Sequence, residues 1–196
     1  MLRAAAPLLA LLLLTACTAQ QEPHTDHVHS SSPPSGGSSS TGSSAAAAPG
    51  SFSETDAAYV QLAIPQDETL LPVLALAKER EGVDPALVSL ATEVQEGHQR
   101  ELERLRGALT DAGRTYLNMH EGHDMPGMVT ADELAKLTNA TGQAFDDLLR
   151  TLLRAHFEES TTVAKSELAA GSSVEVLDVT RGIESSRAAY LEKLGP

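Results

Sequence analysis

The sequence contains very few cysteines and aromatic residues. Its 196 residues include one cysteine, Cys17, and no tryptophan, and aromatic side chains make up only 3% of the chain. A single cysteine excludes both an internal disulfide and a metal cluster held by several thiolates. A core with so few rings must be built from leucine, alanine, valine and isoleucine, which favours helices over sheets.

Basic residues are also scarce. The chain has 14 lysines and arginines against 27 aspartates and glutamates. We therefore expect no nucleic-acid partner, because neutralising phosphates requires a basic face. An acidic surface also repels anionic lipids, so attachment to a membrane should depend on a covalent anchor.

The first 16 residues are typical of a bacterial export signal. Arg3 supplies a positive charge, and an apolar stretch runs from Ala4 to Leu14. This stretch is shorter than the ~20 residues that span a bilayer. The segment Leu14-Thr15-Ala16-Cys17 is similar to a bacterial lipobox, in which the cysteine thiol is diacylated and becomes the new N-terminus. We therefore predict a signal peptide at 1–16 and a lipid anchor on Cys17 at the extracytoplasmic face of the cell membrane; an ordinary secretory leader is the alternative.

Residues 17–52 are predicted to form a flexible tether. They are rich in serine, glycine, proline and alanine, and they contain almost no large apolar residue that could drive folding. His24, His27 and His29 cluster near the start of this segment. Such a cluster is either a weak site for Cu(II) or zinc or simply a polar part of the linker.

Residues 53–196 carry the signals of a helical domain. Helix starts are indicated at Ser53, at Asp84-Pro85 and at Thr130, and Gly171-Ser172-Ser173 indicates the end of one helix and the cap of the next. They predict an all-α, ferritin-like four-helix bundle with long helices at about 54–80, 85–112, 142–170 and 174–194, and a loop with a short helix between 113 and 140.

Two further features refine this bundle. Pro65 and Pro72 lie inside the first helix, and they predict a kink or a late start. Gly82 and Gly171 follow similar helices, which indicates a repeated helical hairpin.

Each long helix has one polar residue on its otherwise apolar face. These residues are Asp67, His98, His156 and Arg187. The face that includes His156 comprises Phe145, Leu148, Leu149, Leu152, Leu153 and Val163. Buried polar groups are costly unless they are paired, so we expect the four to meet. Either Asp67, His98 and His156 bind a metal ion, or Arg187 pairs with Asp67 in a metal-free network; the fixed charge of the arginine favours the second.

The loop before the third long helix concentrates a second set of metal-binding side chains. Met119, His120, His123, Met125 and Met128 lie within ten residues. Thioether sulfur favours Cu(I), and imidazole suits Cu(II) or zinc. The alternative is that Met125 and Met128 pack over the bundle while the histidines face solvent.

Four segments in this order resemble the bacterial ferritin-like family called domain of unknown function 305. They are Ala63-Ile64-Pro65-Gln66-Asp67, His98-Gln99-Arg100-Glu101-Leu102, Met119–Thr130 and Phe145–Phe157, and the third is the most specific. The resemblance covers about 56–194 and implies a ferritin-like fold in the cell envelope. It also implies copper binding, since some members are linked to copper.

The sequence departs from the family pattern at the paired histidines. Gln66 and Asp67 replace one His-His pair, and Phe157 replaces half of the other. The resemblance therefore supports the fold and the location more strongly than it supports a metal site.

No enzyme is expected. The Glu-x-x-His motif of di-iron proteins is absent from the sequence. A nucleophile elbow, a phosphate-binding glycine loop and a zinc-protease motif are absent too. We predict a lipid-anchored protein that binds or buffers metal, copper before zinc. The alternative is an interaction or structural lipoprotein whose former metal layer has become a salt-bridged core.

Overall fold

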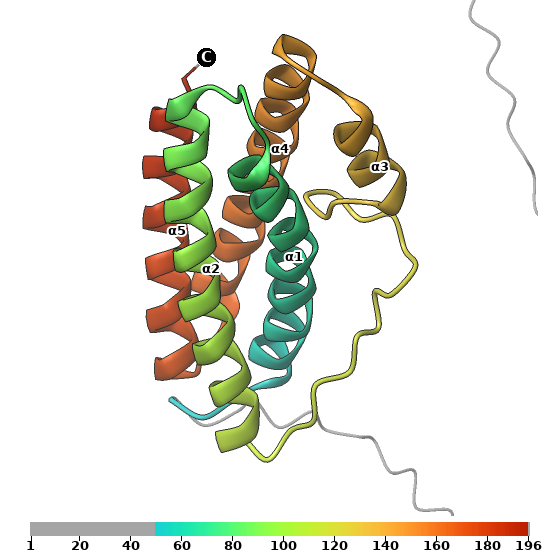
Figure 1. Cartoon of the computed structure of the whole chain (residues 1–196). Helices are drawn as coiled ribbons and strands as arrows, with labels where there is room; N and C mark the ends of the chain where they lie inside the picture. Colours follow the sequence, from blue (N-terminus) through green and yellow to red (C-terminus); the bar gives the residue numbers. More distant parts are fainter. Residues whose placement is uncertain (1–49, 196) are drawn as a thin grey trace, which may run out of the picture. The chain divides into compact units, whose positions relative to one another are not determined.

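The computed structural model describes residues 50–195, which form five α-helices and no extended strand (Figure 1). The helices are α1 Glu54–Glu79, α2 Pro85–Asp111, α3 Ala131–Asn139, α4 Gln143–Ala170 and α5 Val174–Leu194. The predicted all-α class is confirmed, and the ends of the four long helices agree with the prediction to within one residue.

The predicted signal peptide, Cys17 and the histidines His24, His27 and His29 lie outside the described residues. Within residues 50–195, no helix combines the length and the apolar character needed to cross a bilayer.

The helices begin where the capping residues predicted. Ser53 and Thr130 each form a capping box with an acidic residue three positions later, so both partners satisfy backbone N–H groups of the first turn. The side chains of Asp84 and Ser173 accept hydrogen bonds at the starts of α2 and α5. Local sequence therefore fixes four of the five helix starts.

Helix α1 includes both of its prolines. It runs without interruption from Glu54 to Glu79 with Pro65 and Pro72 inside, so the late start allowed by the sequence does not occur. A proline removes one backbone donor, which the helix tolerates when packing on neighbouring helices compensates for the lost hydrogen bond. Pro65 is itself buried in the bundle.

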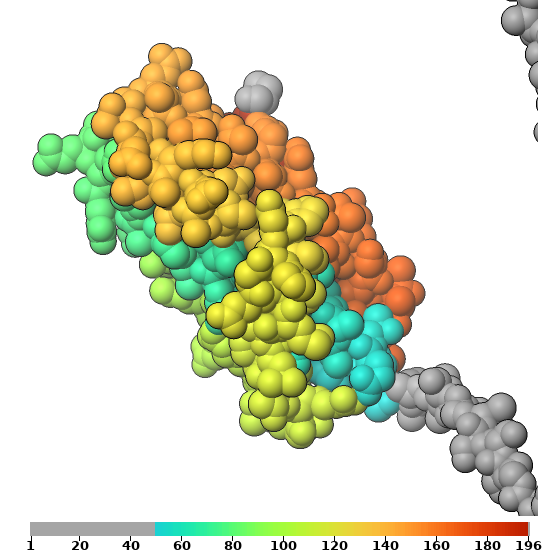
Figure 2. All heavy atoms as spheres, turned by 90° about the vertical axis from the view of Figure 1, so that its right-hand side faces the viewer, coloured from blue at the N-terminus to red at the C-terminus, as the bar shows by residue number. Residues whose placement is uncertain are grey.

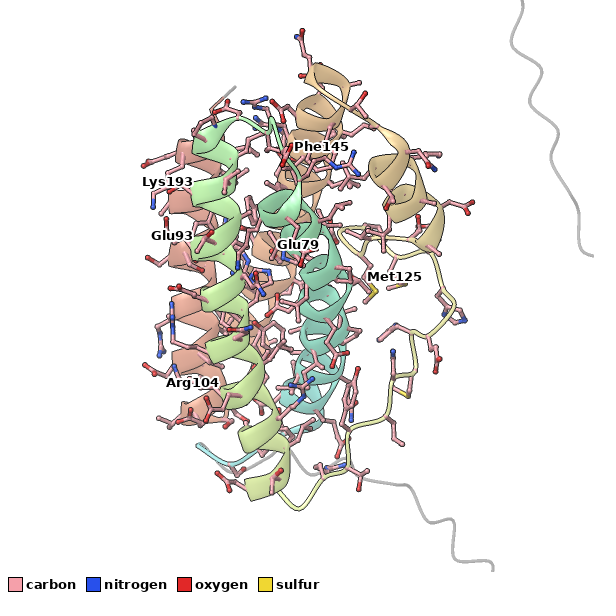
Figure 3. All side chains as sticks on the ribbon, in the orientation of Figure 1. Glu79, Glu93, Arg104, Met125, Phe145 and Lys193 are labelled. Atoms are coloured by element: carbon pink, nitrogen blue, oxygen red, sulfur yellow. The ribbon has the colours of Figure 1, made fainter. Side chains whose placement is uncertain are left out.

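The long helices pack as two hairpins that dock together. α1 packs along α2 and α4 along α5, and the hairpins meet where α1 contacts α4 and α2 contacts α5. Lys193 at the end of α5 pairs with Glu93 of α2 at 2.6 Å (Figure 3). The short helix α3 lies against α1 and α4. The architecture is thus a four-helix bundle with one added short helix.

A polar layer divides the apolar core into two parts. One part contains Leu70, Val73, Leu74 and Ala77 of α1, Leu87, Leu90, Ala91 and Val94 of α2, and Phe145, Leu149, Leu152, Leu153 and Phe157 of α4. The other contains Tyr59, Val60, Ala63 and Ile64 of α1, Leu102, Leu105, Ala108 and Leu109 of α2, and Val176, Val179 and Ile183 of α5. The four predicted interior polar residues all lie between or beside these parts and are buried. Leu148 was expected in the core but is 37% exposed. Its neighbour Leu149 takes the inward position, and adjacent residues of a helix do not share a face.

The loop between α2 and α3 lies along the outside of the bundle. It leaves the end of α2, rises past α1, and turns inwards just before α3 (Figure 1). The space-filling view shows it covering the face between α1 and α4 (Figure 2). The Val129 N–H donates to Thr69 Oγ1 of α1 at 3.2 Å, which ties the end of the loop to the bundle. The predicted metal-binding loop is therefore packed on the bundle surface.

Two carboxyl groups share the end of the bundle where α1 begins. Asp56 accepts hydrogen bonds from the backbone N–H groups of Ser53, Ser172 and Ser173 at 2.6, 3.1 and 3.0 Å. Burial alone would raise the pKa of Asp56, but these bonds and those of the Ser53 side chain lower it below its usual range. The chain entering α1 is thereby joined to the turn between α4 and α5.

Glu167 lies beside this carboxylate in a very different setting. Among the described residues, neither of its buried carboxyl oxygens has a hydrogen-bond donor. Burial, with the neighbouring Asp56 charge, raises the pKa of Glu167 from 4.5 to about 8. A Cβ at Gly171 would lie 2.0 Å from Glu167 Oε1, so a side chain at this position would force the carboxyl group to move. Glu167 is therefore protonated at neutral pH.

The raised pKa of Glu167 predicts that the stability of the folded domain depends on pH. Because the pKa of Glu167 is higher in the folded chain than in the unfolded chain, the folded state binds more protons between about 4.5 and 8, and its stability falls as pH rises through that window. We expect Glu167→Gln to gain stability relative to the wild type between pH 5 and pH 8.5, measured by urea unfolding. The control is Glu158→Gln, at an exposed position of α4. A constant difference between E167Q and wild type across that range would contradict the assignment.

Candidate metal centre

The four interior polar residues meet in one layer, one from each long helix. Nε2 of His98 on α2 lies 2.9 Å from Nε2 of His156 on α4. Oδ1 of Asp67 on α1 lies 3.3 Å from the first of these nitrogens and 3.7 Å from the second. Arg187 Nη2 on α5 donates to the same oxygen at 2.9 Å. The helical periodicity therefore identified the members of this layer correctly.

Arg187 is held by more than Asp67. Its guanidinium makes two parallel hydrogen bonds to the Glu101 carboxylate, at 3.1 and 2.7 Å. Its Nε donates to Ser160 Oγ at 3.2 Å. The helical periodicity did not place Glu101 in this layer, and the structure makes it the main partner of the arginine. Its position three residues after His98, on the same helix face, is the signal that could have placed it here.

The hydrogen bonds define the protonation of the two imidazoles. His156 Nδ1 lies 3.0 Å from the Gly127 carbonyl oxygen, which can only accept, so Nδ1 carries the hydrogen and Nε2 carries a lone pair. His98 Nε2 must then donate in the contact between the two rings. With its hydrogen on Nε2, neutral His98 has no hydrogen on Nδ1, which lies 3.7 Å from Glu101 Oε2 and has no hydrogen-bond partner among the described residues.

Electrostatics keep both histidines neutral. Burial, with a smaller effect from the Arg187 charge, lowers the pKa of His156 to about 3. Burial also lowers the pKa of His98 well below its usual value, and Arg187 again adds to the shift. Neutral imidazole is the form that binds metal ions.

Asp67 is the charge-sensitive member of the layer. Burial raises its pKa well above the usual value; Arg187 opposes this shift, and Glu101 adds to it. Two carboxyl groups thus share one guanidinium, and with both ionised the layer would carry one unbalanced negative charge. Among residues 50–195, Asp67 Oδ2 has no hydrogen-bond donor. A proton or a cation at Asp67 would balance the charge.

The donor set fits a metal ion in composition. One ligand atom each from Asp67, His98 and His156 lies within 4.8 Å of the others. His156 Nδ1 donates to the Gly127 carbonyl, and such an outer partner orients a metal-binding histidine. Binding through His98 Nε2 would require its hydrogen to move to Nδ1, which lies 3.7 Å from the Glu101 carboxylate. The Arg187 contact with Asp67 Oδ1 is the opposing feature, because it occupies one ligand oxygen.

The loop residues predicted from the sequence have unequal surroundings. His120 and His123 line a surface cavity of about 400 Å³ against Pro65 and Thr69 of α1. Met128 is buried and Met125 is half-buried. Met119 is 65% exposed, and it lines neither this cavity nor a smaller cavity that Met125 lines. The five residues therefore do not surround a single point, and their role in metal binding stays a prediction.

The helical domain matches a known protein family. The pattern of the family described as "Domain of unknown function (DUF305)" matches residues 56–195. The chain belongs to the DUF305 family. No curated protein matches the chain.

Solved structures of DUF305 proteins have the same fold. A DUF305 fragment from Deinococcus radiodurans is similar with a TM-score of 0.65 and 17% identity, over 74% of this chain and 95% of that one. A putative secreted DUF305 protein from Streptomyces coelicolor has a TM-score of 0.64 and 17% identity, over 71% of this chain and 89% of its own. At this identity, the likeness supports the all-α fold of the DUF305 domain alone.

The polar layer of this DUF305 domain predicts a large effect of removing its cation. Arg187→Met leaves the buried Asp67 and the partly buried Glu101 facing each other without compensation. We expect a loss of roughly 3–5 kcal/mol of unfolding free energy, measured by urea denaturation at pH 7. The control is Arg106→Met, which breaks the exposed pair with Glu68 and should cost no more than about 1 kcal/mol. Equal effects of the two substitutions would disprove the central role of the buried arginine.

Proposed function

We propose that this DUF305 protein is an exported, lipid-anchored envelope protein that binds and buffers a transition metal, copper before zinc. The metal is its cargo and is held between α1, α2 and α4 by Asp67, His98 and His156. The observation that carries the proposal is the buried layer itself: two neutral imidazoles and a carboxyl group whose charge has no full partner.

Charge balance favours a monovalent ion. Glu101 already neutralises Arg187, so the arginine repels a cation less than the sequence alone suggested. Replacing the Asp67 proton by Cu(I) would leave the layer neutral, whereas a divalent ion would add a positive charge in a dry interior. Imidazole serves Cu(I), Cu(II) and zinc, so the charge is the discriminating factor.

The second candidate is an interaction or structural lipoprotein whose polar layer holds no metal. The observation that favours it is the 2.9 Å bond from Arg187 Nη2 to Asp67 Oδ1, which occupies a ligand atom. In that case the layer serves to fix the register of the helices.

We also propose that the protein lies outside the cytoplasm and acts by binding. The similar Streptomyces coelicolor protein is described as a putative secreted protein. The N-terminal sequence supports export, and the segment before Cys17 supports lipidation at that residue. The missing Glu-x-x-His motif supports a binding role over di-iron catalysis.

A metal titration of the full-length protein tests the first candidate. We expect dissociation constants below about 1 µM for at least one of Cu(I), Cu(II) and zinc, measured by competition with a chromogenic chelator. His98→Gln combined with His156→Gln should weaken binding by roughly a hundredfold, because second and third ligands are lost.

Two further variants locate the site. Replacing His24, His27 and His29 by glutamine controls for the tether and should leave the tight site intact. Binding weaker than micromolar for all three ions would favour the metal-free candidate. A loss of affinity on replacing His120, His123, Met125 and Met128, with no loss in the H98Q/H156Q double variant, would move the holding site to the loop.

The lipid anchor has its own test. Cys17→Ser removes the thiol that would be acylated, and we expect the protein to move from the membrane fraction to the soluble extracytoplasmic fraction. Mass spectrometry of the N-terminal peptide of the wild type should show a diacylated cysteine. A wild-type N-terminus without lipid would exclude the anchor and leave the metal proposal intact.

A further inference from the structure

A cavity lies beneath the predicted methionine loop, beside the interior layer. It has a volume of about 120 Å³ and lies between residues 124–129 and α4. Met125 and Met128 line it together with His156, the interior ligand candidate. Met125 lies on the turn that folds back towards the bundle (Figure 3). A buried histidine of the interior layer thus borders a cavity beneath a surface loop.

The loop is held directly against this histidine. The Gly127 carbonyl accepts the hydrogen bond from His156 Nδ1. Gly127 has a φ of +76°, and a Cβ at this position would lie 2.7 Å from Glu159 Cβ on α4. Only glycine therefore allows the backbone to come close enough to α4 to orient the imidazole.

The side chains around the cavity that could bind a cation differ in exposure. Asp124 is exposed at the cavity and also lines the larger cavity of His120 and His123. Met128 lines both cavities as well, and it is buried. A cation would therefore meet a carboxylate and imidazoles first, thioether sulfurs next, and the imidazole of His156 last.

We propose that this cavity is the route by which Cu(I) reaches and leaves the interior layer, with the Met125 and Met128 sulfurs as transient ligands. The inference rests on the proposed function, since it needs metal to be held by Asp67, His98 and His156. Copper stays in the Cu(I) state throughout, the thioethers and imidazoles exchange as neutral ligands, and the proton that copper replaces on Asp67 leaves to solvent. Thioethers bind Cu(I) well and zinc poorly, so the route selects for copper before the interior site does.

A route changes rates and leaves affinity unaltered. Met125→Leu combined with Met128→Leu removes both sulfurs at nearly constant volume, so packing should be preserved. We expect this variant to take up and release Cu(I) roughly tenfold more slowly while its dissociation constant stays within about twofold of the wild type. Zinc exchange should be unchanged. The matched control is Met119→Leu, which removes an exposed sulfur of the same loop that lines neither cavity.

The measurement is stopped-flow absorbance under anaerobic conditions, with the full-length protein and Cu(I) supplied as its bicinchoninate complex. Slow exchange in M125L/M128L with normal exchange in M119L supports the route. Wild-type rates in M125L/M128L, or equal slowing in M119L, overturn it while the proposed function stands. Weaker equilibrium binding without slower exchange also overturns it, because the sulfurs would then be holding ligands. A wild type that takes up no Cu(I) overturns the route, and the titration with Cu(II) and zinc then decides whether the proposed function stands.

Discussion

Arg187 places a permanent positive charge at the centre of a four-helix bundle, and much of the structure serves to pair it. The guanidinium needs carboxylates from two other helices, Asp67 on α1 and Glu101 on α2, and a hydroxyl from α4. These bonds hold α1, α2, α4 and α5 in one register. A buried ion pair of this kind contributes little net stability compared with apolar packing, so its value lies in specificity or in function.

The same constraint gives the polar layer its chemical character. Because one guanidinium serves two carboxyl groups, the charge on Asp67 is only partly balanced, and the neighbouring imidazoles remain neutral. A proton or a cation at Asp67 would complete the charge balance of the layer. A metal-bound layer and a metal-free layer would therefore be two states of the same arrangement. They would differ in which positive charge balances the Asp67 carboxylate.

The bundle end at Asp56 uses carboxyl groups in another way. There, backbone N–H groups of three serines stabilise Asp56 as an anion, and burial beside this anion raises the pKa of Glu167. No guanidinium or imidazole contributes to these contacts, so the pair joins chain segments and does not resemble a ligand set. The contrast shows that it is the two histidines that distinguish the central layer as a candidate site.

The sequence alone determined the helices, their caps and the identity of the four interior polar residues. Capping side chains act within one turn, and a helix repeats every 3.6 residues, so both signals are local. Only the tertiary structure decided that Glu101 neutralises Arg187, that the Gly127 carbonyl orients His156, and that Met125 and Met128 share a cavity with that histidine while Met119 lines neither cavity. Those contacts join segments that lie apart in the sequence. Whether such segments meet depends on how the helices and the loop pack, and local sequence signals do not encode that packing.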